Sequence, residues 1–245
     1  MTLPSPETVM AALEATWPPA STLGVGAFTL RDGAGGGKRV SAATPNGPEA
    51  TVEDIENAAD VMAAAQCPRL FRLSPGHKVV DQMLADLGYQ IIDPTTLFIA
   101  PTANLLKPDQ APLAAIAAET CLGIQADIWE DGGSGPARRA VMARAASPKA
   151  WLLARVNDRA VGAGFVSVNQ GIAMVHALDV RRHARRQGAG RAMMHRAAAW
   201  AQGHDAAHIG VAVTQANVAA TTLYASLGMT VVEQYHYRIH SNDVD

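Results

Sequence analysis

Apolar residues in the last hundred positions form three runs separated by short polar turns. The runs cover residues 150–156, 160–168 and 172–180. An Asn-Asp pair at 157–158 and the triplet Asn-Gln-Gly at 169–171 separate them. Turn-forming residues between strand-like runs are typical of an antiparallel meander. The pattern therefore predicts three consecutive, paired β-strands.

The periodicity changes after the third predicted strand. Apolar residues recur at helical spacing from 193 to 200, and this pattern ends at Gly203. A short strand is predicted at 209–213, a helix at 217–227 and a last strand at 231–239. A strand–helix–strand crossover attached to a meander predicts an α/β (α+β) fold, with a mixed, mostly antiparallel central sheet flanked by helices.

The segment 101–112 contains three prolines and is predicted to be a linker. Beyond it, residues 111–121 and 138–146 are predicted to form helices. The glycines between residues 123 and 137 predict an exposed loop that joins these helices.

The first hundred residues resemble an incomplete copy of the last hundred. Residues 83–99 align without gaps with residues 223–239, including the Leu-Gly pair that ends the predicted helix. Upstream, a hairpin, a helix and a strand are predicted at 25–44, 52–65 and 69–73. We therefore predict two domains of similar fold, covering residues 1–103 and 104–245.

Composition and charge are those of an ordinary globular protein, with 49% hydrophobic residues and a formal net charge of −2. No apolar run approaches the roughly 18–20 residues that a membrane span needs, and the first residues lack the pattern of a secretory signal. The only two cysteines, Cys67 and Cys121, are too few for a disulfide framework. We expect a cytoplasmic protein without a membrane or nucleic-acid partner.

The segment 177–193 carries the clearest chemical signal. A predicted strand ends there, a loop rich in arginine follows, and Gly188-Ala189-Gly190 opens a predicted helix. The unpaired N–H groups of a helix N-terminus attract anions, and glycines allow an anion to approach closely. These features favour a cradle for a diphosphate, although a glycine-capped loop with solvated arginines has the same pattern.

Two other nucleotide-binding motifs fail on spacing. Met193 stands where a Rossmann fingerprint needs a third glycine or alanine, and Gly37-Lys38 is followed by Arg39 rather than the Ser or Thr of a Walker A loop. The run His-Asp-Ala-Ala-His at 204–208 is one substitution from the HExxH zinc signature. It lies between a predicted helix and a predicted strand, so a loop is favoured over a metal site.

The run RRQGAG at 185–190, which follows ALDV at 177–180, resembles the pyrophosphate loop of the GNAT superfamily of acetyl-CoA-dependent N-acyltransferases. Asn217, Ala220 and Tyr224 are similar to a second signature of that family. The resemblance implies the GNAT fold in both predicted domains, acetyl-CoA as the acyl donor and no metal. It is good for the second domain and weak for the first, where Leu84 stands in the position of Tyr224 and no cofactor loop is found.

The resemblance also implies roles for individual residues. Tyr224 would be the acid that protonates the leaving thiolate. His176 would be the base, as in the similar strand of the arylalkylamine N-acetyltransferases, but a buried structural histidine is the alternative. Strand alternation places His176 and Leu178 on one face. The implied cofactor-binding residues are Leu178, Asp179, Val180, Arg185, Arg186, Gln187, Gly188, Ala189, Gly190, Arg191, Asn217 and Ala220.

Three further residues lie where the family places its acceptor-binding loop. Asp127 and Glu130 are acidic and Trp129 is aromatic, which would suit a cationic amine. The expected function is transfer of an acetyl group to a primary amine of a small molecule, by direct attack in a ternary complex, in a monomer or homodimer. The alternatives are an acetyltransferase that modifies a protein lysine or N-terminus, and a non-catalytic acyl-CoA sensor.

Overall fold

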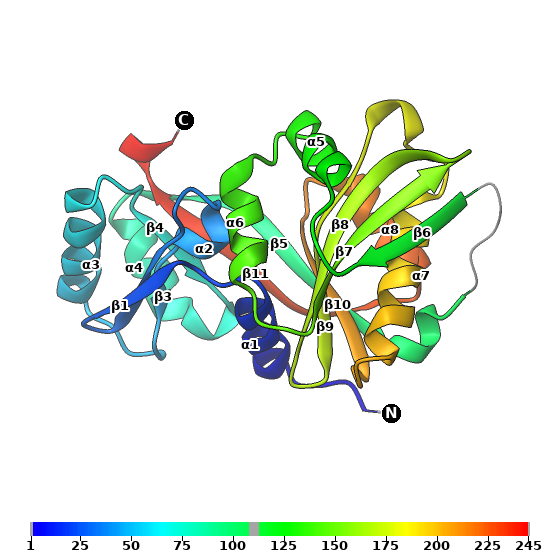
Figure 1. The fold of residues 1–245 in the computed structure, drawn as a ribbon. Helices are drawn as coiled ribbons and strands as arrows, with labels where there is room; N and C mark the ends of the chain where they lie inside the picture. Colours follow the sequence, from blue (N-terminus) through cyan, green and yellow to red (C-terminus); the bar gives the residue numbers. More distant parts are fainter. Residues whose placement is uncertain (1, 108–112, 245) are drawn as a thin grey trace. The chain divides into compact units, whose positions relative to one another are not determined.

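The computed structural model describes residues 2–107 and 113–244, and the chain divides into two compact units (Figure 1). Unit 1 comprises Met1–Pro18, Leu97–Val213 and Asn217–Val232, and unit 2 comprises Pro19–Thr96, Thr214–Ala216 and Glu233–Asp245. Strands β5 (Tyr89–Pro101) and β11 (Thr230–His240) contribute residues to both units. The boundaries of these units therefore differ from the predicted domain boundary between residues 103 and 104.

Unit 1 is built on the predicted meander. Its strands are β6 (Leu113–Ala118), β7 (Lys149–Val156), β8 (Arg159–Asn169), β9 (Ile172–Val180) and β10 (His208–Thr214). They lie in the order β10-β9-β8-β7-β6, in which β6 to β9 pair antiparallel and β10 pairs parallel to β9. The predicted mixed, mostly antiparallel sheet is confirmed.

Helices pack against both faces of the sheet in unit 1, and successive side chains of a strand point to opposite faces. Ala173 and Val175 of β9 join a core with apolar residues of α7 (Ala189–Gln202), whereas His176 contacts Thr16, the last residue of α1 (Pro6–Thr16). The other helices of this unit are α5 (Gly123–Asp131), α6 (Pro136–Arg144) and α8 (Val218–Ser226). Two short 3-10 turns cover Thr102–Leu105 and Arg182–Ala184.

Two predictions for unit 1 are wrong. Residues 113–118, which are rich in alanine, form strand β6 instead of a helix, because pairing with β7 outweighs the helix propensity of alanine. Within the predicted loop 123–137, residues 123–131 form helix α5, which has buried side chains at Gln125, Ile128 and Trp129. That three- and four-residue spacing is the helical signal. Of the predicted linker, residues 108–112 lie outside the described part.

Unit 2 has a small sheet and a separate core. The small sheet consists of β1 (Ser21–Val25), β2 (Phe28–Asp32) and β3 (Thr44–Pro45), and β4 (Leu70–Leu73) pairs antiparallel with β11. Phe28, Phe71 and Leu84 are fully buried in its core. The helices are α2 (Lys38–Ser41), α3 (Val52–Ala64) and α4 (Lys78–Asp86), with 3-10 turns at Pro75–His77 and Ser241–Asp243. A capping box between Thr51 and Asp54 starts α3.

Among the described residues, no helix is both long and apolar enough to cross a membrane.

The last turn of unit 2 is held by an ion pair that makes stability depend on pH. Arg69 donates hydrogen bonds of 2.8 and 3.0 Å to the two carboxylate oxygens of Asp243, and these bonds hold the pKa of Asp243 at about 2. Because the folded-state pKa is lowered, the ionised carboxylate stabilises the fold above about pH 4, and this contribution is lost as the pH falls toward 2.

We expect Asp243→Asn to lower the free energy of unfolding by about 1 kcal/mol at pH 7, since the pair is partly exposed. Urea denaturation at pH 7 and pH 3 measures this, and the difference from wild type should shrink at pH 3. Asp158→Asn removes a carboxylate that is almost fully exposed and should change little. If Asp243→Asn lowered the free energy of unfolding by the same amount at both pH values, stabilisation by the ionised Asp243 carboxylate would be contradicted.

Candidate functional site

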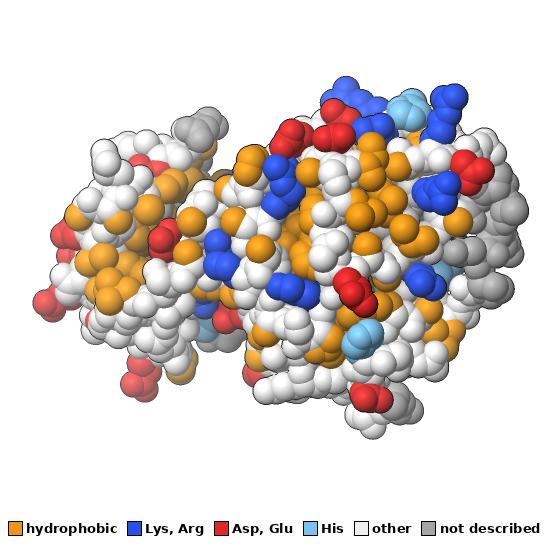
Figure 2. Space-filling view, in the orientation of Figure 1, with side chains coloured by type: hydrophobic (Ala, Val, Ile, Leu, Met, Phe, Trp, Pro, Cys, Tyr) orange, Lys and Arg blue, Asp and Glu red, His pale blue; other side chains and the backbone are white. Residues whose placement is uncertain are grey.

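A cleft of about 500 Å³ lies between the end of β9, the start of α7 and one face of α8 in unit 1. It is lined by Leu178, Asp179, Val180, Ala184, Arg185, Arg186, Gly188, Ala189, Gly190, Arg191, Asn217, Ala219, Ala220, Leu223, Tyr224 and Ser226. Of the twelve predicted cofactor-binding residues, all but Gln187 line it. Figure 2 shows Lys and Arg side chains gathered at the top of unit 1, where Figure 1 places the β9–α7 loop.

The start of α7 has the geometry of an anion site. Gly188 has φ 89°, a left-handed conformation that favours glycine, and it turns the chain into the helix. At Gly190, a Cβ atom would lie 3.1 Å from the Leu223 side chain, so only glycine fits there without displacing that neighbour. The first amides of α7 are therefore presented to the cleft at the positive end of the helix dipole.

The arginines around this helix start differ in their contacts. Arg185 donates to the Val180 carbonyl at 3.0 Å, and Arg191 donates to the Ser226 hydroxyl at 2.6 Å. These two side chains brace the loop and α8. Arg186 is exposed and has φ 64°, so it lies on a strained, solvent-facing turn at the mouth of the cleft.

Strand β9 is irregular where it enters the cleft. In its pairing with β8, His176 lies opposite Phe165 and Asp179 lies opposite Ala163, so two residues of β9 face one residue of β8. The first of the two, Ala177, has φ 48°. This is a β-bulge, and a left-handed alanine costs about 1–2 kcal/mol. The parallel pairs with β10 run only as far as Val175, and the last residues of β9, from Leu178 to Val180, line the cleft.

The bulge reverses the predicted alternation of side chains. His176 was expected on the same face as Leu178, but the extra residue turns Leu178 onto the α7 side, where it packs against the core and where a Cβ atom at Gly190 would lie 3.8 Å from it. His176 is 3% exposed, stacks on Trp17 at 4.9 Å between ring centroids, and lies under α1. It is absent from the residues that line the cleft.

The tautomer of His176 follows from its contact with Thr16. The Thr16 hydroxyl donates to the Ala12 carbonyl at 2.7 Å, which uses its single hydrogen. It must then accept from His176 Nε2, 2.9 Å away. These contacts match the structural alternative for His176, and its role as a base stays a prediction.

Tyr224 lies where the sequence predicts it, on α8 and in the cleft. Its ring is 6% exposed and lies 6.0 Å from the Phe98 ring, between centroids. Burial raises the pKa of Tyr224 to about 12, so the phenol keeps its proton at neutral pH. Asn217, three positions before Ala220, caps α8 by accepting from the Ala220 amide at 3.1 Å. This bond fixes the helix that carries Tyr224.

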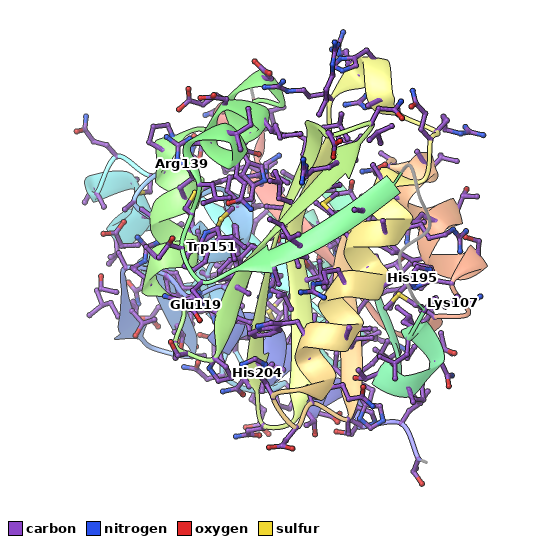
Figure 3. The ribbon with its side chains drawn as sticks, turned by 45° about the vertical axis from the view of Figure 1, so that its right-hand side comes forward. Lys107, Glu119, Arg139, Trp151, His195 and His204 are labelled. Atoms are coloured by element: carbon purple, nitrogen blue, oxygen red, sulfur yellow. The ribbon has the colours of Figure 1, made fainter. Side chains whose placement is uncertain are left out.

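The three predicted acceptor residues do not converge. Asp127 and Glu130 are exposed on α5, and Glu130 forms an ion pair of 2.8 Å with Arg139 (labelled in Figure 3). Trp129 is fully buried, and its indole N–H donates to the Ala177 carbonyl at 2.8 Å. The Trp129 ring has no exposed surface, and its predicted contact with an acceptor stays a prediction. The helical spacing of Gln125, Ile128 and Trp129 is the sequence signal that indicates this burial.

Some residues of the cleft were missed from the sequence. Ala219, Leu223 and Ser226 join Tyr224 on the face of α8 that lines the cleft. The signal was present, because these positions follow the Asn217 cap at helical spacing.

The two histidines of the His-Asp-Ala-Ala-His run belong to different segments. His204 follows α7 (Figure 3) and its Nδ1 lies 2.8 Å from the Trp200 carbonyl oxygen, whereas His208 begins β10. The helix that HExxH requires is therefore absent from these positions. Within residues 2–107 and 113–244, no group of three or more His, Cys, Asp or Glu side chains could hold a metal ion.

Comparisons with known proteins bear on the family and the fold of this chain. Residues 119–229 match the acetyltransferase (GNAT) family. Among solved structures, a GCN5-related N-acetyltransferase from Kribbella flavida is similar over 96% of this chain and 95% of its own, with a TM-score of 0.74 and 16% identity. No curated protein sequence matches.

Two further structures share the fold. A conserved protein of unknown function from Staphylococcus epidermidis is similar over 93% of this chain and 95% of its own, with a TM-score of 0.66 and 11% identity. A tandem GNAT protein from the clavulanic acid biosynthesis pathway is similar over 86% of this chain and 77% of its own, with a TM-score of 0.57 and 12% identity. At these identities the likeness concerns the fold alone.

We expect Thr16→Val to lower the free energy of unfolding by about 1–2 kcal/mol, because it leaves the buried Nε2–H of His176 without its acceptor. Thr16→Ser keeps the hydroxyl and should cost less. Urea denaturation of both variants measures the difference. A larger loss in Thr16→Ser than in Thr16→Val would contradict this assignment, because valine keeps the methyl group and serine keeps the hydroxyl.

Proposed function

Residues 119–229 match the acetyltransferase (GNAT) family, and on this basis we propose that the chain transfers an acetyl group from acetyl-CoA to a primary amine. One observation carries the proposal. A single cleft combines the glycine-opened start of α7, which suits a diphosphate, with the buried phenol of Tyr224, which suits proton donation.

The residues of the cleft fit this cofactor by their own chemistry. The amides from Gln187 to Arg191 would hold the diphosphate, because Gly188 turns the chain into α7 there and the helix dipole favours negative charge. The edge of β9 from Leu178 to Val180 would hold the extended pantetheine arm by backbone hydrogen bonds. When bound, acetyl-CoA supplies the activated acetyl thioester.

Tyr224 would return a proton to the leaving thiolate. Its raised pKa keeps it protonated over the whole neutral range, and its burial shields the donor from competing water. We propose direct attack by the neutral amine, since no cysteine lines the cleft among the described residues. The amine would lose its proton either to His176 or to a water molecule that His176 orients.

The acceptor is proposed to be a small molecule. The exposed carboxylates Asp127 and Glu130 give α5 an acidic surface that would attract a cation. A panel of small amines, lysine peptides and peptides with free N-termini, followed by release of free thiol from acetyl-CoA, tests this choice. Turnover confined to peptides would favour the protein-modifying alternative, and binding without turnover would favour a sensor.

We expect Tyr224→Phe to lower kcat by about 100-fold and to leave the Kd for acetyl-CoA within about twofold, because only the proton donor is removed. Wild-type kcat should show no decline from ionisation of Tyr224 between pH 7 and 10, since the pKa is about 12.

Tyr89→Phe is the matched control. Tyr89 is equally buried but belongs to unit 2, and its loss should leave kcat unchanged. An unchanged kcat in Tyr224→Phe would remove Tyr224 from the proposed reaction.

A further inference from the structure

We propose that Trp129 is a positioning residue that holds the bulge of β9 in the conformation that acetyl-CoA binding requires. The inference rests on the proposed function. It assigns to this tryptophan a role through the backbone of β9, in place of contact with the acceptor. The observation behind it is the hydrogen bond of 2.8 Å from the indole N–H to the Ala177 carbonyl.

The Ala177 carbonyl needs such a partner. Ala177 is the first of the two β9 residues that face one residue of β8, so the regular ladder does not pass through it. Its φ of 48° is one that alanine adopts only when the surroundings hold it there. The peptide that carries this carbonyl joins Ala177 to Leu178, the first β9 residue of the cleft. Its orientation therefore sets the direction of the backbone from Leu178 to Val180.

Helix α5 holds the indole in place from two sides. Gln125 lies one turn before Trp129 on the same face, is fully buried, and donates to the Leu152 carbonyl of β7 at 2.9 Å. The Trp129 carbonyl in turn accepts from the Ser134 amide at 2.6 Å. With α5 tied to β7 through Gln125 and its end closed by the Ser134 amide, the indole N–H has little freedom to leave the Ala177 carbonyl.

The test is Trp129→Phe, which keeps an aromatic ring in the core and removes the N–H. The expected result is an increase of about tenfold in Kd and KM for acetyl-CoA, with kcat changed by less than about threefold. Amide hydrogen exchange without ligand should become faster in the segment 177–180. Trp200→Phe, on α7, is the matched control and should change neither quantity.

A second variant distinguishes positioning from general stability. Glycine adopts the left-handed conformation without strain, so adding Ala177→Gly to Trp129→Phe should restore much of the lost affinity. A purely structural tryptophan would lower the free energy of unfolding without this rescue. Unchanged KM and Kd for acetyl-CoA in Trp129→Phe would overturn the inference. A loss of affinity that Ala177→Gly does not restore would overturn it as well. If wild type itself fails to bind acetyl-CoA, the proposed function fails instead.

Discussion

The bulge at Ala177 is the local constraint on which the rest of the candidate site depends. Before it, β9 pairs with β10 in parallel and with β8 in regular register. After it, Leu178 to Val180 turn toward a cleft that α7 and α8 complete. A left-handed alanine costs about 1–2 kcal/mol, and a buried carbonyl without a partner costs about as much again. The indole of Trp129 satisfies that carbonyl, so the strain can persist at this position.

The same bulge determines which side chains can meet. An unbroken strand would place His176 and Leu178 together, but the extra residue sends Leu178 to the α7 side and leaves His176 under α1. Tyr224 reaches the cleft independently, on a helix whose first turn Asn217 caps. The predicted cofactor loop and the proposed acid therefore line one cleft, while the predicted base is held by Thr16 and Trp17 outside its lining.

Much of the cleft could be predicted because its signals are local. Gly188, Gly190 and the Asn217 cap report backbone conformations that depend on a few neighbouring residues. The wrong predictions concern segments whose secondary structure depends on tertiary contacts. Pairing with β7 makes a strand of alanine-rich residues 113–118, and burial against the sheet makes a helix of residues 123–131. The bulge has no sequence signal, since alanine seldom adopts a positive φ, and with it the separation of His176 from Leu178 was missed.

The proposed function depends on binding of acetyl-CoA by the β9–α7 loop. Calorimetric titration of acetyl-CoA into wild type, beside an Arg186→Glu, Gly188→Glu variant, tests it most directly. Arg159→Glu reverses an exposed charge outside the cleft and serves as the control. We predict stoichiometric binding to wild type and to the control, and its loss in the double variant, where carboxylates would repel the phosphates at the start of α7. Absence of binding to wild type at millimolar acetyl-CoA, or equal binding to the double variant, would contradict the claim.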